Sequence, residues 1–186
     1  MGSSGIGKST LIHMIAGIDQ PTSGTISFQN TNIADLALEQ RINILQQSIG
    51  LVFQQALLLQ ELSVLENIML KQIIHSSVSN NDIIKAQQLL QEVGLLDKAN
   101  SLPSTLSGGQ QQRISILRAI FHVPQFLLAD EPTGNLDKKT GQQIIHLLLK
   151  YKQQYNMGLI ISTHDINIAQ QCDVVLKIEN QSLIKH

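Results

Sequence analysis

A glycine-rich run near the start of the chain restricts its fold more than any other feature. Residues 2–9 read Gly-Ser-Ser-Gly-Ile-Gly-Lys-Ser and fit the pattern G-x-x-x-x-G-K-[ST]. In such a loop, backbone N–H groups surround a di- or triphosphate at a helix N-terminus, the lysine binds the β- and γ-phosphates and the serine binds Mg²⁺. The candidate phosphate-binding residues are Gly2, Ser3, Ser4, Gly5, Ile6, Gly7, Lys8, Ser9 and Thr10.

The same run has a second interpretation as a flexible, glycine-rich segment. A phosphate-binding loop of this type normally follows a β-strand, and only Met1 stands before Gly2 in this sequence. The other motifs therefore have to decide between the two interpretations.

Apolar runs of strand and helix character alternate along most of the chain. This alternation predicts an α/β fold in which parallel strands are joined by crossover helices. The apolar side chains of Ile12, Met14 and Ile15 are expected in the core. Strands are expected at 25–28, 48–54, 126–130, 159–163 and 173–178, and helices at 8–16, 34–45, 140–155 and from 165 onward.

The segment 55–105 differs from the rest, because leucine and isoleucine recur there at helical spacing with almost no strand signal. It predicts an all-helical subdomain inserted into one domain, whose parallel-sheet core consists of 1–54 and 106–186.

Helix boundaries within the inserted segment are indicated by capping residues. Ser63 with Glu66 predicts a capping box at the start of a helix that runs through Ile74. A second helix is expected to be capped by Asn81 or Asp82, and to end at Gly94.

A second glycine pair precedes the helical run that ends near residue 120. Ser107 and Gln110 have capping-box spacing, which by itself predicts an ordinary helix start. A cap does not require Gly108 and Gly109, since glycine weakens early helical positions by up to about 1 kcal/mol each. A ligand that approaches the backbone would explain them, and two anion-binding helix N-termini would suggest a nucleotide bound from two sides.

Two adjacent carboxylates follow the apolar strand expected at 126–130. Asp130 and Glu131 would point to opposite faces, so they suit separate tasks: Asp130 holding Mg²⁺, and Glu131 orienting or deprotonating the attacking water. The alternative is a solvated turn, a common setting for Asp-Glu before proline. A phosphate loop requires such a carboxylate for its metal, which favours the first interpretation.

Two further polar residues end apolar strands, where ligands gather in α/β sheets. His164 is a candidate to donate to a γ-phosphate, and Gln54 to bind a water of the metal. Taken singly, each is better explained as an ordinary residue with no functional role.

Composition and charge exclude several classes of protein. The chain has 186 residues, 42% of them hydrophobic, which suffices for one folded domain and excludes a disordered tail. A formal net charge of −1 provides no field to attract DNA or RNA, so no nucleic-acid partner is expected. The single cysteine, Cys172, indicates a reducing compartment, and no apolar run is long enough to span a bilayer.

Taken together, these residues resemble the nucleotide-binding domain of ATP-binding-cassette (ABC) transporters, and the resemblance covers essentially the whole chain. GSSGIGKST resembles Walker A, LSGGQQQR the signature, and FLLADE Walker B. In the same order, Gln54 corresponds to the Q-loop, the segment 135–137 with Asp137 to the D-loop, and His164 to the switch histidine.

The resemblance implies a P-loop NTPase (RecA-like) parallel-sheet core with an inserted helical subdomain. It also implies a Mg²⁺-dependent ATPase that works as a head-to-tail dimer. Each ATP would lie between Walker A of one copy and the segment Ser107–Gln110 of the other. Ser9, Gln54 and Asp130 would hold Mg²⁺, and Lys8, Gln54, Glu131 and His164 would act in catalysis. GSSGIGKSTLIHMIAGID and DEPTGNLD are most similar to the lipoprotein-releasing (Lol-type) and macrolide-exporter ATPases.

Such ATPases drive an integral-membrane permease from the cytoplasmic face of the inner membrane. The resemblance therefore implies a cytoplasmic, peripherally bound subunit that serves lipoprotein release or export. A cytoplasmic helix of the permease would dock near 53–59 and the start of the helix at Ser63, although the apolar residues 56–59 also suit a core.

Two alternatives remain at this point. One is a non-transport ABC protein that acts on nucleic acid or ribosomes, which the near-zero charge and the single cassette disfavour. The other is a truncated, weakly active or inactive remnant. In the family, a strand precedes Walker A, and further strands carry an aromatic residue that stacks on adenine. Since none of these is in the sequence, we expect weak ATP binding and low stability of the isolated chain.

Overall fold

The order of helices and strands follows the alternation expected from the sequence. The computed structural model describes residues 1–2, 5–179 and 182–185, apart from the side chain of Ala34. The strands are β1 (Ser27–Phe28), β2 (Thr31–Asn32), β3 (Ile49–Val52), β4 (Phe126–Asp130), β5 (Gly158–Ser162), β6 (Leu176–Glu179) and β7 (Ser182–Lys185). The α-helices are α1 (Lys8–Ile15), α2 (Leu38–Ser48), α3 (Val64–Ile68), α4 (Leu70–His75), α5 (Asn80–Glu92), α6 (Gly108–Ile120), α7 (Lys138–Gln154) and α8 (Ile166–Ala169). Short 3₁₀ turns are η1 (Ile33–Asp35), η2 (Leu96–Lys98) and η3 (Pro103–Thr105).

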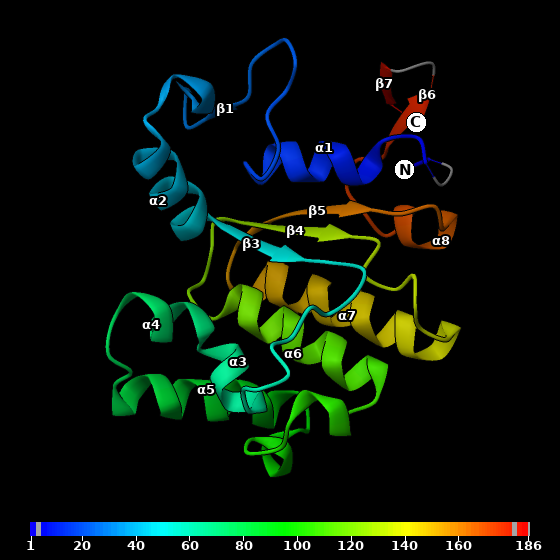
Figure 1. Ribbon diagram of the computed structural model, residues 1–186. Coiled ribbons are helices and arrows are strands. Elements are labelled where there is room, and N and C mark those ends of the chain that lie inside the picture. The colour runs from blue at the N-terminus through cyan, green and yellow to red at the C-terminus, as the bar shows by residue number, and fades with distance from the viewer. Residues whose placement is uncertain (3–4, 180–181, 186) are drawn as a thin grey trace.

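A parallel sheet in the order β3-β4-β5 forms the centre of the molecule. In register, Val52 lies opposite Ala129, and Asp130 lies opposite Ser162. Helix α1 covers one face of the sheet, and α6 and α7 cover the other (Figure 1). The predicted α/β class with parallel strands and crossover helices is confirmed. Because all three strands run the same way, their carboxyl ends meet at one edge.

The main core lies between the sheet and the helices α6 and α7. Leu117 of α6 and Ile144 and Leu148 of α7 are fully buried there. On the opposite face Ile12 of α1 is buried as predicted, whereas Met14 and Ile15 are half-buried, so the prediction that these two side chains lie in the core was wrong. Ile15 lines an apolar groove of about 460 Å³ between α1, β5 and β6, together with residues that include Leu11, Ile161 and Leu176.

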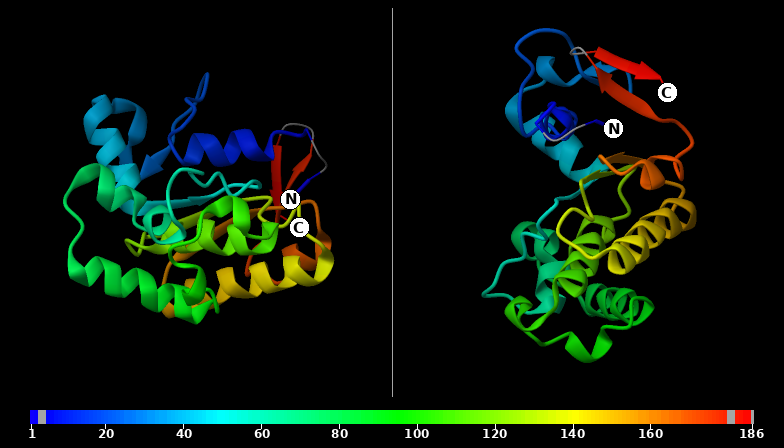
Figure 2. Two further views of the ribbon diagram at one scale, coloured as in Figure 1. Left: turned by 60° about the horizontal axis from the view of Figure 1, so that its bottom comes forward. Right: turned by 90° about the vertical axis from the view of Figure 1, so that its right-hand side faces the viewer.

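Strand β6 lies outside the parallel sheet, which corrects the expectation for 173–178. It pairs antiparallel with β7 in a separate two-stranded sheet, as the side view shows (Figure 2). The start of the chain accounts for this separation, because it lies between β5 and β6. Ile178 N donates to Met1 O over 2.9 Å, and Gly2 N donates to Thr163 O over 3.3 Å.

Two other expected elements differ in extent. The strand expected at 25–28 is reduced to β1, which forms a hairpin with β2 through antiparallel pairing. The helix expected at 34–45 is replaced by η1 and then α2, which begins four residues later than predicted and ends at Ser48.

The segment 55–105 is helical, as predicted, and its helices α3, α4 and α5 lie on the far side of α6 from the sheet (Figures 1 and 2). The Ser63–Glu66 capping box is present, but the helix through Ile74 is interrupted at Met69 and continues as α4. Helix α5 is capped by Ser79, with Asp82 as its reciprocal partner, rather than by Asn81 or Asp82. Gly94, with φ of 69°, follows its end as expected.

Replacing Ser63 by alanine should lower the free energy of unfolding by about 1 kcal/mol. The Ser63 side chain accepts a hydrogen bond from Glu66 N over 3.2 Å, and the Glu66 carboxylate accepts one from Ser63 N over 2.7 Å. The change removes the first of these bonds and leaves an N–H at the helix start without its partner. Urea unfolding followed by circular dichroism measures the loss, and Ser104→Ala, at an exposed serine, should leave the midpoint unchanged.

Among the described residues, none of the helices is both long and apolar enough to cross a bilayer.

Candidate active site

The glycine loop adopts the backbone geometry that its sequence predicts. Gly5 and Gly7 have φ angles of 78° and 100°, a left-handed region that strongly favours glycine, and α1 starts directly afterwards at Lys8. Gly2 is buried, Ile6 is half-buried, and Ser9 and Thr10 are exposed in the first turn of α1. The predicted residues Ser3 and Ser4 lie outside the described residues.

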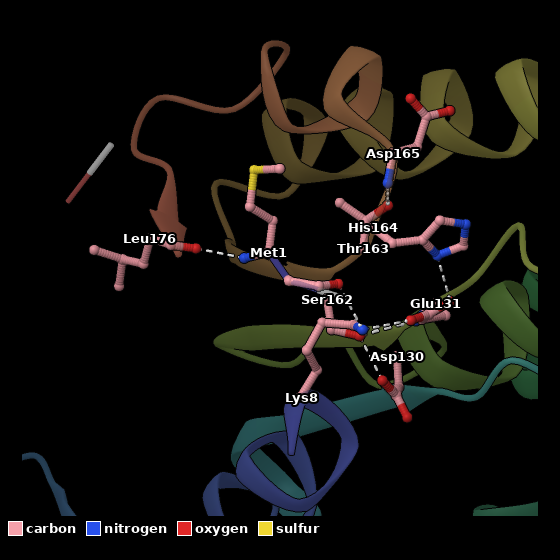
Figure 3. A network of polar contacts seen from close by, with 10 residues as sticks. Met1, Lys8, Asp130, Glu131, Ser162, Thr163, His164, Asp165 and Leu176 are labelled. Carbon is pink, nitrogen blue, oxygen red and sulfur yellow. Dashed lines mark hydrogen bonds and ion pairs between the residues drawn. The ribbon is translucent and has the colours of Figure 1, made fainter. Parts of the chain in front are cut away.

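Three predicted site residues converge at the carboxyl edge of the sheet. Lys8 Nζ lies 2.9 Å from the Gly2 carbonyl oxygen and 2.9 Å from Glu131 Oε1. The second carboxylate oxygen, Glu131 Oε2, lies 2.9 Å from His164 Nδ1. Figure 3 shows the three side chains arriving from the start of α1, the end of β4 and the segment after β5. Side chains that are up to 156 positions apart in the sequence thus form one polar network.

The environment of Glu131 favours its charged form. Burial acts to raise the pKa of Glu131, but hydrogen bonds and positive charge from Lys8 and His164 outweigh it and hold the pKa below its ordinary value. The side chain of Lys8 is 5% exposed and that of Glu131 is 15% exposed, so the pair is largely withdrawn from water. The Glu131 carboxylate therefore forms an ion pair with Lys8, the lysine of the phosphate loop.

Asp130 is held by a different partner, which supports the expectation that the two adjacent acids have separate tasks. It is buried, and its Oδ1 accepts a hydrogen bond from Ser162 Oγ. The same hydroxyl oxygen accepts a hydrogen bond from Glu131 N over 3.1 Å. Sequence analysis did not single out Ser162, although it lies in the strand expected at 159–163.

Replacing Ser162 by alanine should destabilise the fold and weaken metal-dependent activity. The change leaves a buried Asp130 oxygen without its donor, which costs about 1–3 kcal/mol, and it frees Asp130 to turn. We expect a lower unfolding midpoint and a higher Mg²⁺ concentration for half-maximal ATP hydrolysis. Ser162→Thr keeps the hydroxyl and should restore most of both losses. A normal Mg²⁺ dependence in Ser162→Ala would contradict the role of this hydroxyl.

Gln54 belongs to a second group of residues rather than to the lysine network. Its Nε2 donates to Asn135 Oδ1 over 3.2 Å, and Asn135 Nδ2 donates to Gln54 O over 3.5 Å. These two residues line a cavity of about 360 Å³ together with Gly108, Gln111, Gln112 and Leu136. The structure thus brings the predicted Q-loop, signature and D-loop segments to one cavity.

The segment after β3 is bonded directly to α6. Gln112 Nε2 donates to Phe53 O over 2.9 Å, and Arg118 donates to the carbonyl oxygens of Ala56 and Leu57 over 2.9 and 2.8 Å. Sequence analysis assigned no role to Gln112 or Arg118, because backbone acceptors so distant in the sequence leave no local pattern.

The predicted capping box at the start of α6 is confirmed. Ser107 N donates to Gln110 Oε1 over 2.9 Å, and Gln110 N donates to Ser107 Oγ over 3.4 Å. The glycine pair also has a packing reason, since a Cβ atom on Gly109 would lie 2.4 Å from Thr140 Cγ2 of α7. Asp137 caps α7 by accepting from Thr140 N over 3.0 Å.

The donor set fits a nucleotide with Mg²⁺. Mg²⁺ is bound through one or two carboxylates, other oxygen atoms and substrate phosphates, and Asp130, Ser9 and Gln54 supply oxygens of this kind. Among the described residues no group of three or more His, Cys, Asp or Glu gathers as a metal cage. The left-handed glycines and the buried ammonium of Lys8 provide an anion-binding surface at the start of α1.

A phosphate loop on a helix N-terminus, a buried lysine and two acids at the end of a central parallel strand define a P-loop NTPase. The sequence profile described as "ABC transporter" matches residues 1–134, and the chain belongs to this family of ATP-hydrolysing cassettes.

Named relatives and solved structures agree with this placement. The lipoprotein-releasing system ATP-binding protein LolD of Legionella pneumophila (strain Lens) is 40% identical over 98% of this chain and 81% of its own length. LolD of Hydrogenovibrio crunogenus is 43% identical over 93% of this chain and 75% of its own length. The ATP-binding cassette MJ0796, solved as a dimer bound to ADP and Pi, superposes with a TM-score of 0.89 at 36% identity, over 100% of this chain and 82% of that chain.

Proposed function

We propose that the chain is the ATPase subunit of a transporter that releases lipoproteins from a membrane, and that it works as a dimer on the cytoplasmic face of a permease. The observation that carries the ATPase part is the convergence of Lys8, Glu131 and His164 within hydrogen-bonding distance. Lipoprotein release is supported by the LolD relatives, which match nearly the whole chain. Uncharacterised ABC relatives such as YbbA of Escherichia coli are also similar, at 38% identity, so the cargo has to be identified by experiment.

The proposal assigns a role to each residue of the site. Lys8 and the glycine-loop N–H groups bind the phosphates and neutralise the charge that develops on them during transfer. Asp130, Ser9 and Gln54 would hold Mg²⁺, which neutralises phosphate charge when bound. Glu131 orients and deprotonates the attacking water, and His164 donates a hydrogen bond to the terminal phosphate. Residues 107–110 of one copy bind the nucleotide of the other.

The dimer and the division into two parts belong to the same proposal. The solved relative MJ0796 is a dimer, and Gly108 lines a cavity separate from the lysine network, which supports a site shared between two copies. In this arrangement, 1–54 with 106–186 forms the nucleotide-binding core, and 55–105 faces the permease. The exposed leucines Leu57 and Leu59 support this docking role.

An inactive remnant is not favoured, because the residues needed for hydrolysis lie together at one edge of the sheet. A direct test is ATP hydrolysis by the purified chain with Mg²⁺, compared with EDTA and with Lys8→Ala. We expect Mg²⁺-dependent phosphate release that Lys8→Ala lowers at least a hundredfold. Equal release by the Lys8→Ala variant would overturn the assignment of the site.

Lipoprotein release needs its own test. In Legionella pneumophila depleted of its own LolD, the chain should restore release of lipoproteins from the membrane, and Lys8→Ala should not. Failure to restore release, by a chain that is present at the normal level of LolD and hydrolyses ATP, would overturn the proposed cargo and leave the ATPase assignment intact.

A further inference from the structure

The ammonium of Lys8 already has an anion as its partner. Glu131 Oε1 lies 2.9 Å from Lys8 Nζ, at the position where a phosphate-loop lysine otherwise meets phosphate oxygens. Both side chains are mostly withdrawn from water, with 5% and 15% of their surfaces exposed. A charge-assisted bond in such surroundings is stronger than the same pair at the surface.

The second oxygen of the same carboxylate is also engaged. Glu131 Oε2 lies 2.9 Å from Nδ1 of His164, whose side chain is 62% exposed. The two oxygens of Glu131 therefore contact Lys8 and His164, the two basic side chains that would bind phosphate in the proposed function. While these bonds last, the carboxylate is turned away from the task of activating water.

The backbone places Glu131 in this arrangement. Its φ of 41° lies in the left-handed region, an uncommon conformation for a residue with a side chain, and its N–H donates to both the carbonyl and the hydroxyl oxygen of Ser162 over 3.1 Å. Asp130, one residue earlier, turns to Ser162 instead (Figure 3). Lys8 is thus paired with one particular acid, and β5 fixes that acid's backbone.

We propose that the nucleotide-free chain is self-inhibited, with the Glu131 carboxylate occupying the place of a nucleotide phosphate on Lys8. The proposal rests on the proposed function, because it assigns a regulatory state to the same site. Binding then exchanges one anion for another: nucleotide phosphates displace the carboxylate from Lys8. The exchange frees Glu131 for water and His164 for the terminal phosphate in the same step, so the hydrolytic groups become available only when phosphate is bound.

Removing the competing charge should strengthen nucleotide binding. We expect Glu131→Gln to bind ADP with Mg²⁺ about tenfold more tightly than the unaltered chain, since a neutral amide competes less well for an ammonium. ADP is the probe because it has no γ-phosphate, so neither blocked hydrolysis nor contacts to that phosphate enter the comparison. Isothermal titration at low protein concentration measures the affinity, and Glu131→Ala should give an increase of similar size.

A matched control removes the same charge from another ion pair. Glu92 Oε2 lies 2.9 Å from Lys150 Nζ, on helices α5 and α7, and Glu92→Gln should leave ADP affinity unchanged within twofold. Equal ADP affinity of the unaltered chain and Glu131→Gln would overturn the self-inhibited state and leave the proposed function standing. Absence of ADP binding by every variant would overturn the proposed function, and the self-inhibited state with it.

The imidazole of His164 provides a second readout without activity. Its ring signals in a two-dimensional NMR spectrum are assigned by their loss in His164→Gln. ADP should move these signals in the unaltered chain toward their position in nucleotide-free Glu131→Gln, since both changes break the bond to the carboxylate. Signals that stay in place when ADP saturates the unaltered chain would show that Glu131 is not displaced, and would overturn the proposal.

Discussion

Glu131→Gln should lower the rate of ATP hydrolysis by a factor on the order of 10²–10⁴, while ATP-bound dimers accumulate. The amide keeps the size of the side chain but cannot take a proton from the attacking water. ATP binding and the closure of two copies around it do not need that proton transfer, so the cycle stops before hydrolysis. Phosphate release measures the first effect, and light scattering with and without ATP measures the second.

The control for this result is again Glu92→Gln, which should hydrolyse ATP at the normal rate. Hydrolysis by Glu131→Gln within tenfold of the normal rate would show that another group activates the water. A variant that stays monomeric with ATP, while a longer cassette of the family dimerises under the same conditions, would contradict the expected trapping.

Leu117→Ala should lower the free energy of unfolding by about 2–5 kcal/mol, because it leaves a cavity in a fully buried position. Helix α6 packs between the sheet and the helices α3 and α5, so neighbouring elements on both sides limit how far the site can collapse. Against a total of about 5–15 kcal/mol for a typical domain, this loss is large. The sequence has no tryptophan, so circular dichroism follows the unfolding.

Leu38→Ala provides the comparison, because the same atoms are removed from a leucine that is 60% exposed. Its unfolding midpoint should change by no more than a typical surface substitution, within about 0.5 kcal/mol. An equal loss of unfolding free energy in both variants would mean that the burial of Leu117 in α6 does not stabilise the fold.

The parallel sheet and its phosphate loop were predictable because their signals are local. Glycines at fixed spacing specify the left-handed turns before α1, and an apolar strand that ends in Asp130 and Glu131 specifies the edge where the site forms. The order of apolar runs then limits the topology, since parallel strands need crossover helices.

What the sequence did not predict depends on contacts between distant residues. The role of Ser162 arises only because the register places it opposite Asp130. The exposure of Met14 and Ile15 depends on what covers the second face of α1, which periodicity within the helix does not contain. The partner of Glu131 was likewise hidden, because an ion pair with Lys8 depends on a backbone conformation that the residue type does not favour.

The bonds from α6 to residues 53–57 have a mechanical consequence. Gln112 and Arg118 donate hydrogen bonds to three backbone carbonyl oxygens, so a rotation of α6 moves Phe53, Ala56 and Leu57 with it. Helix α6 and residues 53–57 therefore move as one unit, which extends from Gly108 to the exposed side chain of Leu57. The segment around Leu57 is therefore connected to α6 by these hydrogen bonds, in addition to the packing of α6 on β3.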